Sequence, residues 1–355
     1  MVAGAFGDAC REPLRFGGPG RISAGLRSAR GGLGVAPDGD QEPMKLETDL
    51  FGVQFQNPIL LAAGTCGFGQ ELSEVLDLES LGGFVTKSVT VEPRVGNAPP
   101  RVTEFGGGML NSIGLTNPGL ERTKRDKLPW LRSNVRRAKV LVSLAGHTVE
   151  QYFELIEGLD GEDGFLGFEL NLSCPNDAKL GGLPFALDVA AVAEILTGCR
   201  ARTQRPLLAK LAPNDLDLAE TARIATDSGA DGLTLVNTLP GILLRGASGE
   251  PELGAGPGGV SGPALRPVGL KAVQEARKGT NLPLLGVGGV LAAQDAVAYA
   301  RAGASLVQIG TATFAAPRAA QRVVAGLARW GRRHGVGAWT ELIAESPDRE
   351  NAWQT

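Results

Sequence analysis

Polar side chains stand at or near the ends of several apolar runs of this chain, where a buried strand normally continues into apolar residues or turn formers. The set comprises two lysines, several amides and hydroxyls, and one thiol: Lys87, Ser88, Asn171, Ser173, Cys174, Lys210, Asn237 and Thr238. One such residue alone is best explained as a snorkelling lysine or a turn asparagine. A group that converges on one face is better explained as a ligand site.

Two glycine-containing runs, GVGGV at 286–290 and QIGTA at 308–312, end the last two apolar runs. Backbone N–H groups in such turns can bind a phosphate, and glycine allows the phosphate to approach closely. Either run alone could also be a plain turn. The run GTCGFG at 64–69 lacks the G-x-G-x-x-G spacing of a dinucleotide-binding turn.

The two lysines favour an anionic ligand. If Lys87 and Lys210 point into the protein interior, their ammonium groups need anionic partners, because an unpaired buried charge is costly. A phosphorylated, electron-rich ring such as a reduced flavin supplies them, and a nearby lysine stabilises the charge of the reduced form. Together, the lysines and the glycine-containing runs predict FMN as the cofactor, with no dinucleotide bound by this chain.

Eight short apolar runs predict buried strands that are covered on both faces. Amphipathic stretches lie between the runs, for example one in which Val189, Val192 and Leu196 share a helical face. Eight strand–helix units over about 250 residues predict an α/β fold, a (β/α)8 TIM barrel, with a doubly wound sheet as the alternative. The runs cover residues 58–64, 83–90, 139–146, 164–174, 206–213, 232–238, 282–290 and 306–314.

Two connections, 91–137 and 240–266, are too long for simple loops. Both follow the carboxyl ends of predicted strands, which is the face where barrel active sites lie, so we expect inserted loops or hairpins there. Residues 45–56 alternate around Gly52 and predict a hairpin that closes the bottom of the barrel.

The first 43 residues differ from the rest of the chain. They contain ten glycines and five arginines but no lysine, and they show neither helical nor strand periodicity. We expect a low-complexity, disordered extension at 1–43 and a catalytic domain at 44–355. An alternative is that translation starts at Met44 and the extension is an artefact.

Composition excludes several classes of protein. The 355 residues include 35 Lys and Arg and 38 Asp and Glu, a net charge of −3, which argues against a nucleic-acid binder. The longest apolar runs have the length of strands, so no membrane span is expected. The four cysteines, at 10, 66, 174 and 199, have no C-x-x-C spacing. We therefore expect neither a disulfide scaffold nor a metal site, and a cytoplasmic protein.

From Met44 onward, the chain resembles class 1 dihydroorotate dehydrogenases. The resemblance rests on the run ELNLSCPN at 169–176 and on seven other motifs. The blocks at 86–101 and 258–267 look most like subclass 1B, the NAD-linked form. The other motifs are NPILLAAGTCGFG (57–69), TKSVTVEPRVGNAPPR (86–101), LNSIGLTNPG (110–119), LLAKLAPN (207–214), VNTLPG (236–241), GGVSGPALRP (258–267) and GVGGV (286–290).

This resemblance implies an FMN-dependent barrel that oxidises (S)-dihydroorotate to orotate in de novo pyrimidine biosynthesis. Class 1 enzymes use the cysteine of this loop, here Cys174, as the base that takes the C5 proton, while N5 of FMN takes the C6 hydride. A free thiol has a pKa of about 8.5, and this pKa must be lowered toward neutral for the thiol to act well as a base. Lys87 could contribute to that lowering, so Cys174 and Lys87 are the predicted catalytic residues.

The resemblance also implies the binding residues. Eight are expected to contact the substrate: Lys87, Asn111, Gly114, Leu115, Asn171, Asn176, Asn237 and Thr238. Twelve are expected to contact FMN: Ala63, Gly64, Lys87, Ser88, Asn171, Lys210, Ser261, Gly262, Gly288, Gly289, Gly310 and Thr311.

Reoxidation of the cofactor needs a partner if NAD is the acceptor. This chain has neither a nicotinamide fingerprint nor cysteines spaced for an iron–sulfur cluster. The subclass 1B resemblance implies a homodimer of this chain with an electron-transfer subunit that carries FAD and a 2Fe–2S cluster. The alternatives are a fumarate-linked class 1A enzyme, a flavin barrel acting on dihydrouracil, a flavin-dependent RNA modifier, and a flavin-free phosphosugar-type barrel or a binding protein.

Overall fold

Eight parallel strands form a closed barrel in the computed structural model, which describes residues 42–173 and 184–344. Each strand lies within one of the eight predicted runs, so the predicted (β/α)8 barrel is confirmed and the doubly wound alternative is wrong. The strands are shorter than the runs: β3 (Ile59–Leu61), β4 (Gly83–Val85), β7 (Lys139–Leu144), β8 (Gly167–Asn171), β9 (Leu207–Lys210), β10 (Gly232–Leu235), β13 (Leu284–Val287) and β14 (Leu306–Ile309).

The order of the strands around the barrel places distant parts of the chain opposite each other. The ring runs β10, β13, β14, β3, β4, β7, β8, β9 and closes on β10. Three strands therefore separate β8 from β14 in either direction, and three separate β4 from β10. Side chains that point inward from such a pair meet across the interior.

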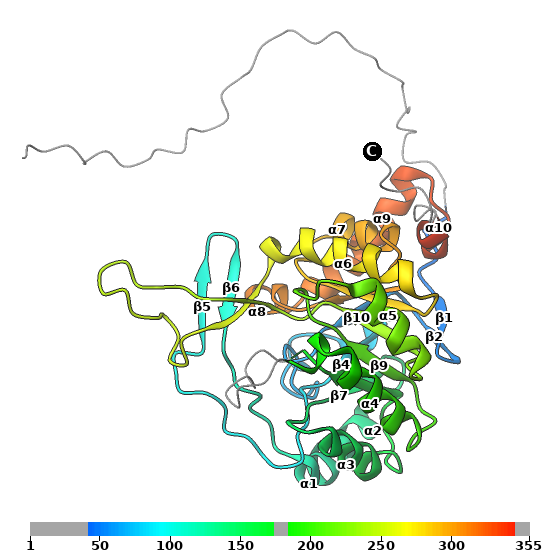
Figure 1. The fold of residues 1–355 in the computed structure, drawn as a ribbon. Coiled ribbons are helices and arrows are strands. Elements are labelled where there is room, and N and C mark those ends of the chain that lie inside the picture. Colours follow the sequence, from blue (N-terminus) through cyan, green and yellow to red (C-terminus); the bar gives the residue numbers. More distant parts are fainter. Residues whose placement is uncertain (1–41, 174–183, 345–355) are drawn as a thin grey trace, which may run out of the picture. The chain divides into compact units, whose positions relative to one another are not determined.

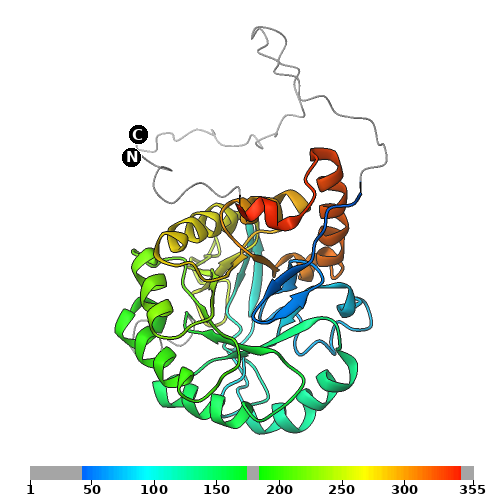
Figure 2. The ribbon, with the colours of Figure 1, turned by 90° about the vertical axis from the view of Figure 1, so that its right-hand side faces the viewer.

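Helices surround the strands, as Figure 2 shows in a view toward the end of the barrel that carries β1 and β2. Helix α4 begins where Asp188 accepts hydrogen bonds from Ala190 N and Ala191 N. Its Val192 and Leu196 are buried, whereas Val189, the first residue of the helix, is exposed. The helices are α1 (Leu120–Arg122), α2 (Leu128–Asn134), α3 (Val149–Leu159), α4 (Val189–Arg200), α5 (Leu218–Asp227), α6 (Arg266–Gly279), α7 (Ala293–Arg301), α8 (Ala312–Ala315), α9 (Ala319–His334) and α10 (Trp339–Ala344).

Short helical turns complete the described helical structure. A five-residue π-helical segment, η2 (Thr123–Lys127), joins α1 to α2. Three 3-10 helices lie in connections: η1 (Leu78–Ser80), η4 (Phe185–Leu187) and η5 (Pro263–Leu265).

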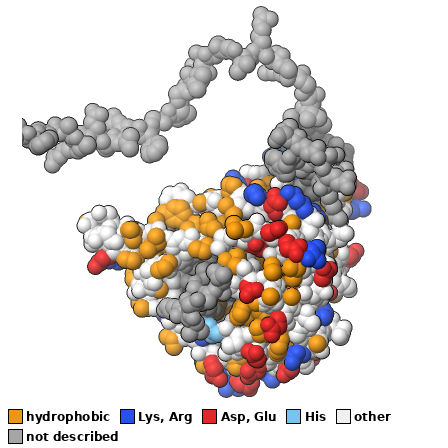
Figure 3. Space-filling model, in the orientation of Figure 1, with side chains coloured by type: hydrophobic (Ala, Val, Ile, Leu, Met, Phe, Trp, Pro, Cys, Tyr) orange, Lys and Arg blue, Asp and Glu red, His pale blue; other side chains and the backbone are white. Residues whose placement is uncertain are grey.

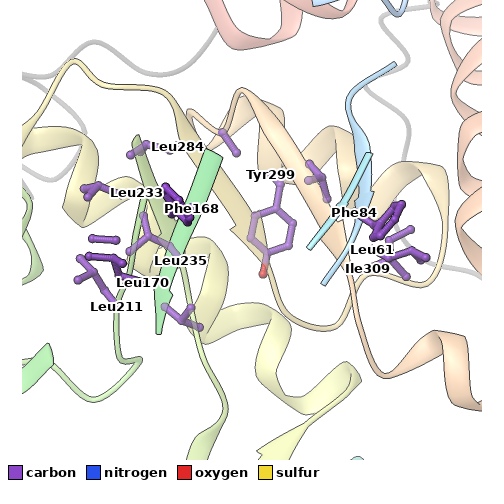
Figure 4. Packing of buried hydrophobic residues seen from close by; sticks show 14 of the residues in the cluster. Leu61, Phe84, Phe168, Leu170, Leu211, Leu233, Leu235, Leu284, Tyr299 and Ile309 are labelled. Carbon is purple, nitrogen blue, oxygen red and sulfur yellow. The ribbon is translucent and has the colours of Figure 1, made fainter. Parts of the chain in front are cut away.

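Side chains alternate between the two faces of every barrel strand. Outward residues such as Phe84, Phe168 and Leu233 join one large core between strands and helices (Figure 4). Inward residues of six strands form a second apolar cluster inside the barrel, made of Leu60, Val85, Leu141, Leu208, Leu285 and Leu306. The strands are thus buried on both faces, which explains why the runs are almost continuously apolar.

The predicted hairpin is present at the bottom of the barrel. Strands β1 (Thr48–Leu50) and β2 (Val53–Phe55) pair antiparallel, with Thr48 opposite Phe55. Phe55 is fully buried and packs in the inner cluster, so the hairpin closes the end of the barrel where the strands begin.

The two long connections pair with each other above the opposite end. Strands β5 (Val102–Phe105) and β6 (Gly108–Asn111) come from the first, and β11 (Leu239–Gly241) and β12 (Gly258–Ser261) from the second. They form one antiparallel sheet in the order β11, β12, β6, β5, in which Val260 lies opposite Leu110. Figure 1 shows β5 and β6 on the side of the barrel away from β1 and β2.

The predicted domain boundary falls close to the start of the described structure. Residues 1–41 of the predicted extension lie outside the described residues. Met44 is buried, and Lys45 N donates to Gly337 O, which ties the first described residues to the segment between α9 and α10.

Substitution of Gly83 tests whether β4 and β7 need a glycine where they approach each other closely. A Cβ at this position would lie 2.1 Å from Lys139 O, a backbone atom of the neighbouring strand. We expect Gly83→Ala to lower the free energy of unfolding by about 2 kcal/mol or more, because the strands must separate. Urea denaturation measures this change. The control is Gly106→Ala in the turn between β5 and β6, where a Cβ meets nothing within 4 Å, and it should change stability by less than about 0.5 kcal/mol.

Candidate active site

A cavity of about 290 Å³ lies at the carboxyl ends of the barrel strands. Its lining comes from the last residues of β8, β9 and β13, from the segments that follow β3, β4, β10, β13 and β14, and from the four-stranded sheet. Among the described residues, the lining contains two lysines and no acidic side chain. The cavity is therefore suited to an anionic ligand.

The structure brings almost all of the described predicted site residues together around this cavity. Those that line it are Ala63, Gly64, Lys87, Ser88, Asn111, Leu115, Asn171, Lys210, Asn237, Thr238, Ser261, Gly262, Gly288, Gly289, Gly310 and Thr311. Gly114 is not part of the lining, although its neighbours Ile113 and Leu115 are. Cys174 and Asn176 lie outside the described residues. The roles assigned to all of these residues stay predictions.

Hydrogen bonds hold the amides of the cavity in defined orientations. Asn171 Nδ2 donates to Ser88 Oγ at 3.4 Å, and Asn171 Oδ1 accepts from Asn237 Nδ2 at 3.1 Å. Ser88 Oγ is in turn 2.8 Å from Ser143 Oγ, and Asn111 Nδ2 donates to Gly259 O at 3.2 Å. Fixed amides can present both donors and acceptors to the edge of a flat, uncharged ring.

The turns after β13 and β14 expose backbone to the cavity. Gly288 and Gly289 have φ angles of 125° and 67°, which side chains with a Cβ rarely adopt. Tyr299 fixes this turn from behind, since its hydroxyl lies 3.1 Å from Val287 O and 2.8 Å from Gly288 O. Burial raises the pKa of Tyr299, so the phenol keeps the proton that these carbonyls accept. A Cβ at Gly310 would have its nearest neighbour at 3.5 Å, which leaves room beside the backbone.

The lysines are held differently. Lys87 lies near Gly64, where an added Cβ would be 3.8 Å from Lys87 Nζ. Lys210 is almost completely buried at the floor of the cavity, and its Nζ lies 3.6 Å from Oε1 of Glu169. This ion pair partly balances the charge of Lys210 inside the barrel.

Sequence reasoning missed Glu169, Gln308 and the apolar part of the lining. Glu169 stands two residues before Asn171 on β8, so strand alternation could have placed both on the inner face. The same alternation relates Met109 and Ile113 to Asn111. The other missed lining residues carry no chemical signature: Ala62, Thr65, Val102, Val236, Leu265, Val287, Val290, Leu291, Ala312 and Phe314.

Comparisons with known proteins agree with this geometry. A sequence model described as dihydroorotate dehydrogenase matches residues 45–330. The chain belongs to the dihydroorotate dehydrogenase family. A relative from Pelobacter propionicus, named dihydroorotate dehydrogenase B (NAD(+)), catalytic subunit, is 42% identical over 299 residues, which cover 84% of this chain and 97% of that protein.

Other members of this family differ in the electron acceptor that their names give. A relative from Solibacter usitatus, named putative dihydroorotate dehydrogenase A (fumarate), is 41% identical over 299 residues, 84% of this chain and 97% of that protein. A crystal structure of dihydroorotate dehydrogenase in complex with ferulenol from Eimeria tenella is similar in fold. Its TM-score is 0.72 at 23% identity, over 90% of this chain and 92% of that one.

The described residues contain neither a candidate metal site nor a candidate membrane-spanning helix. Between 42 and 173 and between 184 and 344, no three or more His, Cys, Asp or Glu side chains are grouped so that they could hold a metal ion. In the same ranges, no helix has the length and apolar character needed to cross a membrane.

The two described cysteines, Cys66 and Cys199, have buried thiols of low reactivity. Burial raises the pKa of Cys66 from 9.0 to about 12, and the nearby Glu71 charge adds to the shift. Burial also raises the pKa of Cys199 to about 12, against the opposing effect of Arg202 and Arg200. Both thiols are therefore poor bases and poor nucleophiles near neutral pH.

The raised thiol pKa values predict a loss of stability at alkaline pH. Above pH 9 the unfolded chain releases the Cys66 proton while the native protein keeps it, so unfolding is favoured as pH rises toward 12. The free energy of unfolding should fall between pH 8 and pH 10 by about 1.4 kcal/mol more in the parent protein than in Cys66→Ala. Urea denaturation at both pH values measures the difference. Equal slopes would mean that Cys66 ionises in the native state.

Proposed function

We propose that this chain oxidises (S)-dihydroorotate to orotate, with FMN as its cofactor, in pyrimidine biosynthesis in the cytoplasm. The observation that carries the proposal is the convergence of Lys87, Lys210, Asn111, Asn171 and Asn237 on one cavity, in a chain of the dihydroorotate dehydrogenase family. The cavity suits a phosphorylated ring and a flat carboxylate substrate, because its lining combines two cations, several amides and exposed glycine backbone.

The residues present fit FMN. Gly288, Gly289, Gly310 and Thr311 would hold the phosphate through backbone N–H groups. Lys87 and Lys210 would contact the ring and favour its reduced, more negative form. When it is bound, FMN supplies a two-electron acceptor for the hydride that leaves C6 of the substrate. The other predicted FMN contacts, Ala63, Gly64, Ser88, Asn171, Ser261 and Gly262, line the same cavity.

The amides would bind the substrate ring. Asn237 Nδ2 donates a hydrogen bond to Asn171 Oδ1, and this bond fixes the orientation of both amide groups. Asn111 and Thr238 line the same cavity, and the dihydroorotate carboxylate would take Lys87 together with backbone N–H groups near Gly114. Such fixed groups orient the ring so that C5 and C6 face the base and the cofactor.

Cys174 would remove the C5 proton. It follows β8 by three residues, and β8 ends at Asn171 within the cavity lining. Tyr152 Oη donates to Asn171 O at 2.9 Å and so anchors the strand end that leads to Cys174. Lys87 would favour the thiolate through its positive charge.

Electrons would leave through a partner subunit that carries FAD and a 2Fe–2S cluster and reduces NAD, with this chain as a homodimer. Apolar side chains at the mouth of the cavity support a docking partner: Val102, Leu291 and Phe314 are 46%, 49% and 58% exposed. In Figure 3, hydrophobic side chains gather over β5, β6 and α8, where this mouth lies. The "catalytic subunit" in the names of relatives is consistent with such an assembly.

The second candidate is a fumarate-linked enzyme that works without a partner. It is favoured by the Solibacter relative, which is as similar to this chain as many NAD-linked ones. Fumarate reduction by the purified lone chain at the rate of dihydroorotate oxidation would establish this alternative.

Anaerobic mixing tests the proposed function. The purified chain should absorb near 450 nm, and addition of dihydroorotate should bleach that band within one turnover, because the bound flavin becomes reduced. Dihydrouracil is the matched control and should leave the band unchanged. A colourless protein that does not take up added FMN would refute the cofactor, and bleaching by dihydrouracil alone would refute the substrate.

Cys174→Ser tests the base. We expect this variant to retain FMN and substrate binding but to lose about 10²- to 10⁴-fold in the rate of flavin reduction at neutral pH, because a hydroxyl is a far weaker base than a thiol. Stopped-flow absorbance measures the rate. Cys199→Ser is the control and should react normally. Near-normal reduction by Cys174→Ser would remove Cys174 from the mechanism.

A further inference from the structure

A polar layer crosses the interior of the barrel directly beneath the cavity. Glu169 on β8 is completely buried, and its Oε2 accepts hydrogen bonds from Thr234 Oγ1 at 2.8 Å and from Gln308 Nε2 at 2.9 Å. Its Oε1 lies 3.6 Å from Lys210 Nζ. These partners stand on β10, β14 and β9, so the carboxylate is held from across the barrel as well as from its own side.

Stability alone does not account for this layer. A buried carboxylate loses its hydration, and a buried ion pair is commonly no more stable than apolar residues of the same size. The layer below it is apolar, with Leu208 and Leu285 at the inward positions of β9 and β13. Within the described part of the chain, Glu169 Oε1 has no hydrogen-bond partner, so its main interaction is the charge of Lys210.

We infer that Glu169 is a positioning residue that holds the Lys210 ammonium at the floor of the cavity and thereby sets the redox potential of the bound flavin. The inference rests on the proposed function, since it takes FMN as the occupant of the cavity. Lysine has a long, flexible side chain. The carboxylate is fixed by two hydrogen bonds, so it gives the Lys210 ammonium a rigid, negatively charged anchor.

The sign of the change in flavin potential distinguishes a positioning role of Glu169 from a direct electrostatic effect of its charge on the flavin. If Lys210 stays in place without Glu169, removal of a negative charge makes the cavity more positive and raises the flavin potential. If the position of Lys210 depends on Glu169, removal of Glu169 withdraws the Lys210 ammonium from the cavity floor. The flavin potential then falls, as it would on loss of Lys210 itself.

The experiment measures the two-electron midpoint potential of bound FMN in the parent protein, Glu169→Gln, Lys210→Met and the double variant. We expect Glu169→Gln to reduce the equilibrium constant for flavin reduction at least tenfold, which corresponds to about 30 mV. The double variant should lie at or above the potential of Lys210→Met, because without Lys210 the change at Glu169 only removes a negative charge. A raised or unchanged potential in Glu169→Gln, or a further fall in the double variant, would overturn the inference.

Two additional measurements keep the result interpretable. Asp231→Asn is the matched control: it makes the same carboxylate-to-amide change at the opposite end of β9, where Asp231 Oδ2 accepts from Leu207 N, and it should leave the potential unchanged. If Glu169→Gln does not fold, Glu169→Asp keeps the charge but withdraws it by one methylene, and it should still lower the potential. An unchanged potential in Glu169→Asp would then count against the inference.

A separate readout does not need the flavin. In urea denaturation of the FMN-free protein, each single variant should lower the midpoint, and the double variant should recover part of the loss, because one unpaired buried charge is worse than none. Independent effects of the two changes would overturn the anchoring of Lys210. If the parent protein bound no FMN, the proposed cofactor would fail, while this cycle would still decide whether Glu169 anchors Lys210.

Discussion

The closure of eight parallel strands into one ring is the constraint on which the rest of this structure depends. Closure places all eight carboxyl ends at one rim, and strand alternation then decides which side chains face inward there. Lys87, Asn171, Lys210 and Asn237 come from widely separated parts of the sequence, yet each follows or ends a strand and so reaches the same cavity. No local motif joins them; the shared rim does.

The interior of the barrel changes character along its axis. Leucines, Val85 and Phe55 fill the end where the strands begin, and two residues beyond Leu208 and Leu306 the inward positions become Lys210 and Gln308, which lie beside Glu169 of β8. An apolar plug excludes water from below, which strengthens every charge interaction in the layer above it. Glu169, Lys210 and Gln308 therefore have a greater electrostatic effect on a ligand in the cavity than they would have at the protein surface.

Much of this could be predicted from the sequence, and the part that could not has a physical reason. Buried parallel strands give continuous apolar runs, so all eight were found, and a lysine or asparagine that interrupts such a run stands out. The meeting of Glu169 with Gln308 joins residues 139 positions apart and depends on which strands lie opposite in the closed ring. The pairing of β6 with β12 likewise joins segments about 150 residues apart and leaves no local periodic signal. Sequence spacing records neither contact.

The four-stranded sheet links two insertions that arise from opposite sides of the ring, after β4 and after β10. Each supplies the backbone partners of the other, so neither segment can be shortened or lengthened alone without leaving N–H and C=O groups unpaired. In evolutionary terms, the two insertions behave as a single inherited unit. Change in the mouth of this barrel should come through substitutions on their side chains, whereas insertions and deletions should be confined to the turn between Arg245 and Glu250, because farther along the same segment Gly254 N already donates to Pro100 O of the first insertion.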